Sequence, residues 1–182
     1  MGGKSSMNDK HLPALARHEP PRCEPVSIND VVPIGPGVRA EADVPLPEAP
    51  PELAVRILVV DDDPSVAMAF SDILSAQGHL VEIASSSRAA LPLIETGAYA
   101  VVVTDMRMPD LDGPALYREV ITRCPLLEKS FLFVTGDTFS AETNRFLKET
   151  GAVYLGKPCT FEEVESAVKQ VLRRRAEESG SE

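Results

Sequence analysis

Residues 56–64, RILVVDDDP, give the clearest indication of the fold class of this chain. Residues 57–60 are apolar and mostly β-branched, which is typical of a short strand buried on both faces. Asp63 followed by Pro64 is typical of a helix N-cap with proline at the first helical position. A buried strand that passes directly into a helix predicts a parallel sheet whose strands are joined by helices.

The same alternation of strand and helix continues along the chain. Apolar runs predict four further strands, at residues 80–84, 100–104, 131–134 and 153–155. Apolar residues at helical spacing predict helices over residues 64–77, 86–97, 114–123 and 140–149, and a last helix that opens at Thr160. Thr160 and Glu163 form a capping box there, whereas Pro92 is expected to kink or shorten the second helix. The pattern predicts an α/β fold, a (βα)5 doubly wound five-stranded parallel sheet.

The distribution of proline divides the chain into segments of different composition. Ten of the 16 prolines precede residue 52, in a segment without sustained strand or helix periodicity. We therefore predict a disordered Pro-rich N-terminal tail over residues 1–52, a folded domain over residues 53–175 and a disordered C-terminal tail over residues 176–182.

Composition excludes several classes of function. A net charge of −10 argues against direct binding of nucleic acid, which needs clustered Lys and Arg. No apolar run reaches the roughly 18 residues of a membrane span. Cys23, Cys124 and Cys159 lie far apart without a CxxC motif, so neither a disulfide framework nor a zinc site is expected, and the cytoplasm is the predicted compartment.

Polar side chains follow four of the predicted strands, at the ends where ligands bind in an open parallel sheet. The first strand ends in residues 61–63, all Asp; Asp105 follows the third, Thr135 the fourth and Lys157 the fifth. A single Asp in such a place is usually a helix cap or a solvated loop acid, but the joint occurrence favours a site. Two carboxylates about 5 Å apart repel by roughly 3 kcal/mol at an effective dielectric near 20. Mg²⁺ relieves that repulsion, so the pattern predicts a site for Mg²⁺ and a phosphoryl group, contacted by Lys157 and Thr135.

Four sequence blocks resemble those of one known family. They are ILVVDDDP at residues 57–64, VVTDMRMPDLDG at 102–113, VTG at 134–136 and GAVYLGKP at 151–158. Together they resemble the receiver domains of bacterial response regulators, with the resemblance covering residues 56–174. The resemblance implies a flavodoxin-like receiver fold with strand order 2-1-3-4-5.

The resemblance also implies roles for the acidic residues. Asp105 matches the phosphoacceptor of the family. Asp61 and Asp62 match the acidic pair that holds Mg²⁺, with Asp62 as the more direct ligand, and the backbone carbonyl of Arg107 would complete the protein's coordination of the metal.

Residues of the fourth and fifth blocks match the family's switch. Thr135 resembles the hydroxyl that moves toward the phosphoryl group, and Tyr154 the aromatic residue whose rotamer follows it. Lys157 resembles the lysine that contacts the phosphoryl group, and its bond to Pro158 is expected to be cis.

The implied function is a phosphorylated switch in a two-component phosphorelay. A sensor histidine kinase or a histidine phosphotransfer protein would phosphorylate Asp105, and the face around the fourth helix, fifth strand and last helix would bind a downstream protein target. Such a chain catalyses nothing beyond its own phosphorylation and dephosphorylation. A homodimer through that face stays open.

Three other interpretations stay open or are disfavoured. The chain could be the receiver module of a larger hybrid histidine kinase. A pseudo-receiver, a binding module that takes no phosphate, is disfavoured by the intact set of site residues. A phosphatase of the haloacid-dehalogenase type carries its nucleophile in a DxDx motif after the first strand, which residues 61–64 do not fit.

Three departures from the family pattern carry their own predictions. Cys159 follows the Lys-Pro pair and is expected to act as a small buried hydrophobe. Arg107 and Asp137, two residues after the phosphoacceptor and after Thr135, predict a salt bridge across the mouth of the site. The run of three arginines at 173–175 is expected to complement the dipole at the end of the last helix.

Overall fold

The computed structural model describes residues 54–96, 99–138 and 140–179. Strands and helices alternate along these residues as predicted, and a short 3₁₀ helix, η1, is added before the fourth strand. The elements are β1 (Arg56–Val60), α1 (Pro64–Ala76), β2 (Leu80–Ala84), α2 (Ser87–Glu95), β3 (Val101–Asp105), α3 (Gly113–Arg123), η1 (Pro125–Ser130), β4 (Phe131–Thr135), α4 (Ala141–Thr150), β5 (Val153–Gly156) and α5 (Phe161–Ser179). The predicted N-terminal tail over residues 1–52 lies outside the described residues.

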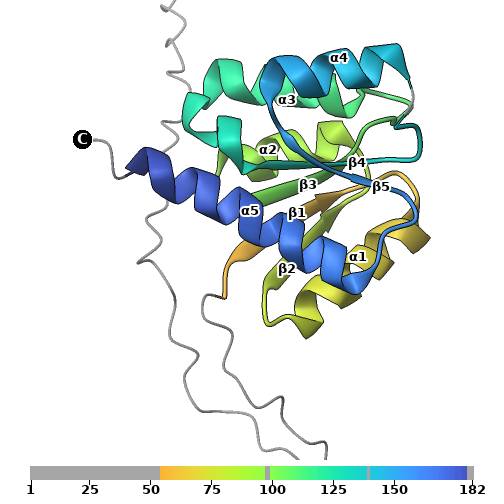
Figure 1. Cartoon of the computed structure of the whole chain (residues 1–182), viewed down its shortest axis with the longest axis vertical. Coiled ribbons are helices and arrows are strands. Elements are labelled where there is room, and N and C mark those ends of the chain that lie inside the picture. Colours follow the sequence, from red (N-terminus) through yellow and green to blue (C-terminus); the bar gives the residue numbers. More distant parts are fainter. Residues whose placement is uncertain (1–53, 97–98, 139, 180–182) are drawn as a thin grey trace, which may run out of the picture.

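The five strands form one parallel sheet in the order β2-β1-β3-β4-β5, which confirms the predicted fold class. Helices α1 and α5 cover one face of the sheet, and α2, α3 and α4 cover the other (Figure 1). Residue Val60 pairs with Thr104, Asp105 with Val134, and Thr135 with Gly156. This register brings the carboxyl ends of four strands to one edge of the sheet.

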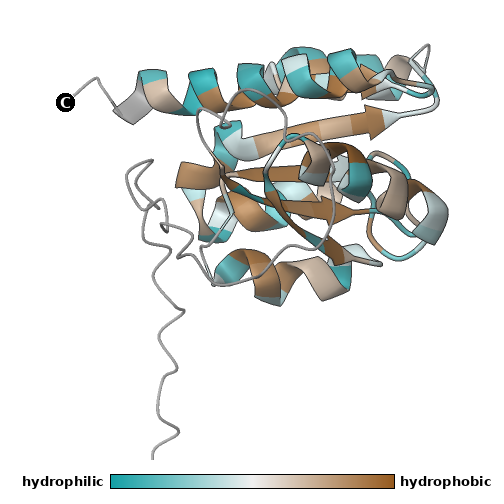
Figure 2. Ribbon diagram, turned by 90° about the horizontal axis from the view of Figure 1, so that it is seen from below, coloured by the Kyte–Doolittle hydropathy of each residue, from teal (hydrophilic) through white to brown (hydrophobic). Residues whose placement is uncertain are grey.

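Both faces of the sheet are buried, which is why the strands are nearly continuous apolar runs. In β1, Ile57 and Val59 pack into the core beneath α1 and α5, whereas Leu58 and Val60 pack into the core beneath α2, α3 and α4. The hydrophobic strands lie between helices whose outer faces are hydrophilic (Figure 2).

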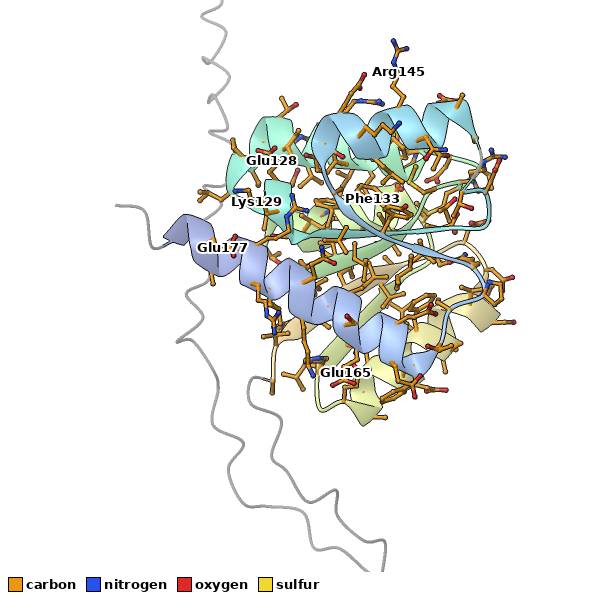
Figure 3. The ribbon with its side chains drawn as sticks, viewed as in Figure 1. Glu128, Lys129, Phe133, Arg145, Glu165 and Glu177 are labelled. Carbon is orange, nitrogen blue, oxygen red and sulfur yellow. The ribbon has the colours of Figure 1, made fainter. Side chains whose placement is uncertain are left out.

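An aromatic cluster anchors α3 and α4 to the sheet. Phe133 of β4 lies in the interior (Figure 3) and meets Phe146 of α4 edge-on, with ring centroids 5.0 Å apart. Tyr117 of α3 makes edge contacts with Phe131, Phe133 and Phe146 at 5.2–5.9 Å. Aromatic pairs of this kind add about 0.5–1.5 kcal/mol each beyond the area they bury.

The end of α5 corrects two predictions. The helix continues to Ser179, so the proposed C-terminal tail does not begin at residue 176. The last turn holds no basic residue, so the arginines at 173–175 are not placed to complement the dipole there. Arg175 instead donates hydrogen bonds to the backbone carbonyls of Tyr99 and Ala100, at 3.4 and 2.5 Å. This contact joins α5 to the start of β3.

Local capping follows the predictions closely. The Asp63 carboxylate accepts a hydrogen bond from Ser65 N at 2.8 Å at the start of α1. The capping box at α5 forms in both directions, with Thr160 N to Glu163 Oε2 at 2.7 Å and Glu163 N to Thr160 Oγ1 at 3.3 Å. Pro92 lies inside α2, which ends three residues later at Glu95.

Two of the three cysteines lie within the described residues. Cys159 is a free thiol. Cys124 caps α3, is 2% exposed and lies in the core beneath α2, α3 and α4.

Candidate functional site

A single ammonium group joins two carboxylates at the carboxyl edge of the sheet. Lys157 Nζ lies 2.5 Å from Asp105 Oδ1 and 3.0 Å from Asp61 Oδ2. The two carboxylates therefore meet at the same ammonium group. The side chains of Asp61 and Asp105 are only 6% and 11% exposed, so solvent screens this cluster weakly.

Charge rather than burial controls the ionisation of this lysine. Burial alone would lower the pKa of Lys157, but hydrogen bonds from its ammonium to Asp105 and Asp61, together with their negative charges, raise that pKa overall. Lys157 therefore carries its positive charge throughout the neutral range. Two acids share one base, so the cluster retains an excess of negative charge.

Backbone contacts fix the phosphoacceptor candidate, Asp105, at the last position of β3. Its Oδ2 accepts a hydrogen bond from Arg107 N at 2.7 Å. Met106 N donates to the Val134 carbonyl at 2.9 Å, so the loop stays attached to β4 directly after Asp105. The carboxylate is thus held at the end of the strand with Oδ1 directed to Lys157.

The structure explains why position 113 is a glycine, which the sequence alone does not. A side chain at this position would overlap the carbonyl of Asp105 and press on Met106 Cα. Gly113 N also donates to the Met106 carbonyl at 3.2 Å, which returns the loop to the strand end. The glycine is required because the start of α3 lies directly against the backbone of Asp105.

The end of β4 carries Thr135, which is 2% exposed. Its carbonyl accepts a hydrogen bond from Lys157 N at 2.7 Å, and its hydroxyl oxygen accepts one from Asp137 N at 3.0 Å. The bond between Lys157 and Pro158 is cis, as the resemblance implied. Thr135 and Lys157 are therefore neighbours at the same edge as Asp105.

The predicted salt bridge between Arg107 and Asp137 is present. Arg107 Nη2 donates to Asp137 Oδ2 at 2.7 Å, and the two side chains are 69% and 41% exposed. The pair links the loop after β3 with the loop after β4 at the rim of the site.

Two of the predicted site residues lie apart from the central cluster. Asp62, expected to be the more direct metal ligand, is exposed to solvent. Tyr154 is half exposed on β5. Cys159 is half buried and packs against the core beneath α1 and α5, and burial together with Glu163 raises the pKa of its thiol, which supports a packing role.

The donor chemistry fits a Mg²⁺ ion, although the acids are not gathered as tightly as predicted. Within the residues that the structure describes, no three His, Cys, Asp or Glu side chains converge on one point. Lys157 draws Asp61 and Asp105 together, while Asp62 faces water. Mg²⁺ takes one or two carboxylates and keeps several waters, so these oxygen donors suit it.

A family model confirms what the geometry indicates. The model described as response regulator receiver domain matches residues 57–169. This chain belongs to the response regulator receiver domain family. The match covers all five strands except the first residue of β1, and every candidate site residue named above.

Individual relatives agree with the family. The chain is 35% identical over 129 residues to the response regulator MprA of Mycolicibacterium vanbaalenii, a match covering 71% of this chain and 55% of that protein. It is 31% identical over 124 residues to the sensor kinase CckA of Brucella abortus, a match covering 67% of this chain and 13% of that protein. The chain therefore spans about half the length of MprA and a much smaller share of CckA.

Solved structures match the fold. The chemotaxis protein CheY4 of Vibrio cholerae aligns with a TM-score of 0.60 at 28% identity, covering 65% of this chain and 99% of that chain. A CheY-like receiver domain protein of Methanospirillum hungatei aligns with a TM-score of 0.62 at 29% identity, covering 69% and 98% of the two chains. None of the helices within the described residues is both long and apolar enough to cross a bilayer.

Proposed function

We propose that this receiver accepts a phosphoryl group on Asp105 from the phosphohistidine of a sensor histidine kinase or a histidine phosphotransfer protein. A carboxylate oxygen of Asp105 attacks phosphorus, the phosphorus–nitrogen bond breaks, and its electron pair stays on the imidazole. The observation that carries the proposal is the position of Lys157, whose ammonium touches both Asp105 and Asp61. The cluster thus brings a nucleophile and a positive charge to one point.

Each charged group has a distinct task in this proposal. Lys157, kept charged by its two carboxylates, binds oxygens of the incoming phosphoryl group and offsets their negative charge. The side chains of Asp61, Asp62 and Asp105 and the carbonyl of Arg107 would hold Mg²⁺. When bound, that ion neutralises charge on the transferring group.

The readout proposed for this chain runs through Thr135 and Tyr154. An acyl phosphate adds about two negative charges beside Lys157 and offers new acceptors to the Thr135 hydroxyl. Movement of that hydroxyl leaves room for the Tyr154 ring, which is half exposed in this structure. The face made by α4, β5 and α5 would then shift between two populations and bind a downstream protein, or a second copy of the chain.

Intact mass spectrometry tests the proposal directly. The full chain is incubated with acetyl phosphate or phosphoramidate and Mg²⁺, and a gain of one phosphoryl group is expected. Asp105→Asn should abolish that gain, because the amide is no nucleophile. Asp72→Asn, on the exposed surface of α1, is the matched control and should be phosphorylated like the unchanged protein.

Two other results would each contradict the proposal. Continuous release of phosphate, with no stable phosphorylated species and dependence on an acid other than Asp105, would indicate a phosphatase. Failure of the unchanged protein to gain mass from either donor, with Mg²⁺ present, would indicate a pseudo-receiver that binds partners without phosphate.

A receiver module of a larger hybrid histidine kinase is the second candidate, and the match to the sensor kinase CckA favours it. In either setting we place the domain in the cytoplasm, where a kinase partner would have ATP. The size of the native polypeptide that carries this receiver separates the two settings: a polypeptide that also contains a kinase catalytic region supports the hybrid kinase, and a shorter one that is phosphorylated by a separate kinase supports the stand-alone receiver.

A further inference from the structure

The carboxylate of Asp137 connects the phosphoacceptor loop with the start of α4. Its Oδ2 accepts the hydrogen bond from Arg107 Nη2 at 2.7 Å, and its Oδ1 accepts one from Ser140 N at 3.0 Å. Ser140 is the N-cap of α4, and its hydroxyl accepts a hydrogen bond from Thr143 N. One side chain therefore holds both the loop after β3 and the first turn of a helix.

The other contacts of the two paired residues lead to the reacting centre. Arg107 N donates to Asp105 Oδ2 at 2.7 Å, and Asp137 N donates to the Thr135 hydroxyl at 3.0 Å. A change at Asp105 therefore reaches Asp137 by two routes, through Arg107 and through the contacts that join Lys157 to Thr135.

The ion pair is weak enough to be broken by a stronger anion. Both side chains are substantially exposed, at 69% and 41%, and pairs in water contribute little to stability. A phosphoryl group on Asp105 would carry about two negative charges and three acceptor oxygens two residues from Arg107. The phosphoryl group carries about twice the negative charge of the Asp137 carboxylate, which accepts one hydrogen bond from Arg107, and it can accept two parallel hydrogen bonds from the guanidinium.

We propose that the Arg107–Asp137 ion pair is a latch: it holds the first turn of α4 while Asp105 is unmodified, and a phosphoryl group on Asp105 draws Arg107 away and releases it. The latch rests on the proposed phosphorylation of Asp105. Asp137 acts as a positioning residue, since it reaches the partner-binding surface through α4.

The packing of α4 suits such a release. Farther along the helix, Phe146 is 5% exposed and packed on Phe133, so this part of α4 is fixed to the core. The first turn is held mainly by polar contacts, from Asp137, from Ser140 and from the Asn144 side chain, which donates to the Thr138 and Ser140 carbonyls. Arg107, Ser140 and Phe146 also line one groove between α3 and α4, so opening the latch changes the shape of a surface that a protein partner can contact.

A double-mutant cycle read out at α4 tests the latch. The variants of the full chain are Arg107→Gln, Asp137→Asn and the two combined; the Asn side chain keeps an acceptor for Ser140 N but loses the charge. The readout is the hydrogen-exchange rate of the Asn144 backbone N–H. This group donates to the Ser140 carbonyl at 3.0 Å and so closes the first turn of α4. Exchange is measured by NMR before and after phosphorylation with phosphoramidate and Mg²⁺.

The expected result is a coupling that phosphorylation removes. In the unmodified protein each single variant should raise Asn144 exchange about two- to fivefold, and the double variant should raise it no further. After phosphorylation the four proteins should exchange alike. Lys169→Gln, which breaks the Lys169–Glu165 pair on α5 on the other face of the sheet (Figure 3), should change neither state.

Two failures can be told apart. If intact mass shows phosphorylation but the coupling at Asn144 is unchanged, or the single variants do not alter exchange, the latch is wrong and the phosphoacceptor role stands. If no mass is gained, the proposed function fails and the release step fails with it.

Discussion

The two edges of the sheet both carry clusters of charged side chains, but their charges balance differently. At the carboxyl edge, Asp61 and Asp105 share the one ammonium of Lys157, which leaves negative charge in excess. Near the amino edge, the Arg56 guanidinium lies 3.5 Å from Glu82 Oε2 and 5.4 Å from the centre of the Tyr99 ring. In this pair one acid faces one base.

Hydrogen bonds from a tyrosine hydroxyl and to backbone carbonyls complete the amino-edge cluster. The Tyr99 hydroxyl donates to Glu82 Oε2 at 2.5 Å, and Arg175 satisfies the carbonyls of Tyr99 and Ala100. At this edge the acid has a base as its partner and the carbonyls have a guanidinium donor, so these contacts stabilise the fold. An excess of carboxylates on one ammonium, in contrast, is satisfied fully only when another cation binds, which distinguishes a functional edge from a structural one.

Replacing Gly113 by Ala should produce the largest effect on the carboxyl edge. The new methyl group would overlap the backbone of Asp105, which cannot rotate away as a side chain can. We expect a loss of about 1–3 kcal/mol in the free energy of unfolding. Because Asp105 must move, its phosphorylation rate should fall about 100-fold. Urea unfolding and mass-detected phosphorylation measure the two effects.

Gly136→Ala is the matched control at the same edge. Nothing lies within 4 Å of a methyl group at that position, so its unfolding free energy should stay within about 0.5 kcal/mol of the unchanged protein. Equal behaviour of the two variants would show that the close approach of α3 to Asp105 does not constrain the site.

Arg175→Met should give the second largest effect, confined to stability. The substitution keeps the apolar stem but removes the donor to the carbonyls of Tyr99 and Ala100, at a cost of about 1–3 kcal/mol. Phosphorylation of Asp105 should be unchanged, because the contact lies at the opposite edge. The control Arg173→Met alters an exposed arginine of the same helix; a loss of stability as large as that of Arg175→Met would contradict the assigned contact.

Most of the fold and the centre of the site could be predicted because they follow from local patterns. A strand buried on both faces needs an apolar run, and the register of parallel strands then brings Asp61, Asp105, Thr135 and Lys157 to one edge. The capping residues Asp63 and Thr160 were predictable for the same reason, since each acts within three residues of itself.

The rest depends on contacts between distant residues. The hydrogen bond from Arg175 to the Ala100 carbonyl joins residues 75 positions apart, and no local sequence pattern predicts it. The six residues of η1 are too few to show a helical pattern. The exposure of Asp62 could not be predicted either, because the sequence presents three consecutive acids and only the fold decides which of them meets Lys157.

Tyr99→Phe should give the smallest effect and one that depends on pH. Burial, then the hydrogen bond and charge of Glu82, raise the pKa of Tyr99 from 10.0 to about 12. The folded protein thus holds this proton more tightly than the unfolded chain. The contribution is complete below pH 10 and is lost as the pH rises from 10 to about 12.

At pH 8 the variant should be less stable by about 1 kcal/mol, because the hydrogen bond from the hydroxyl to Glu82 is lost and water replaces it only in part. The difference from the unchanged protein should shrink toward pH 12, as measured by denaturant unfolding at each pH. Tyr117, whose pKa burial also raises, is present in both proteins and therefore cancels from the difference. A difference that stays constant from pH 8 to pH 12 would show that the Tyr99 hydroxyl does not stabilise the amino edge through Glu82. The contrast drawn between the two edges would then no longer hold for the amino edge.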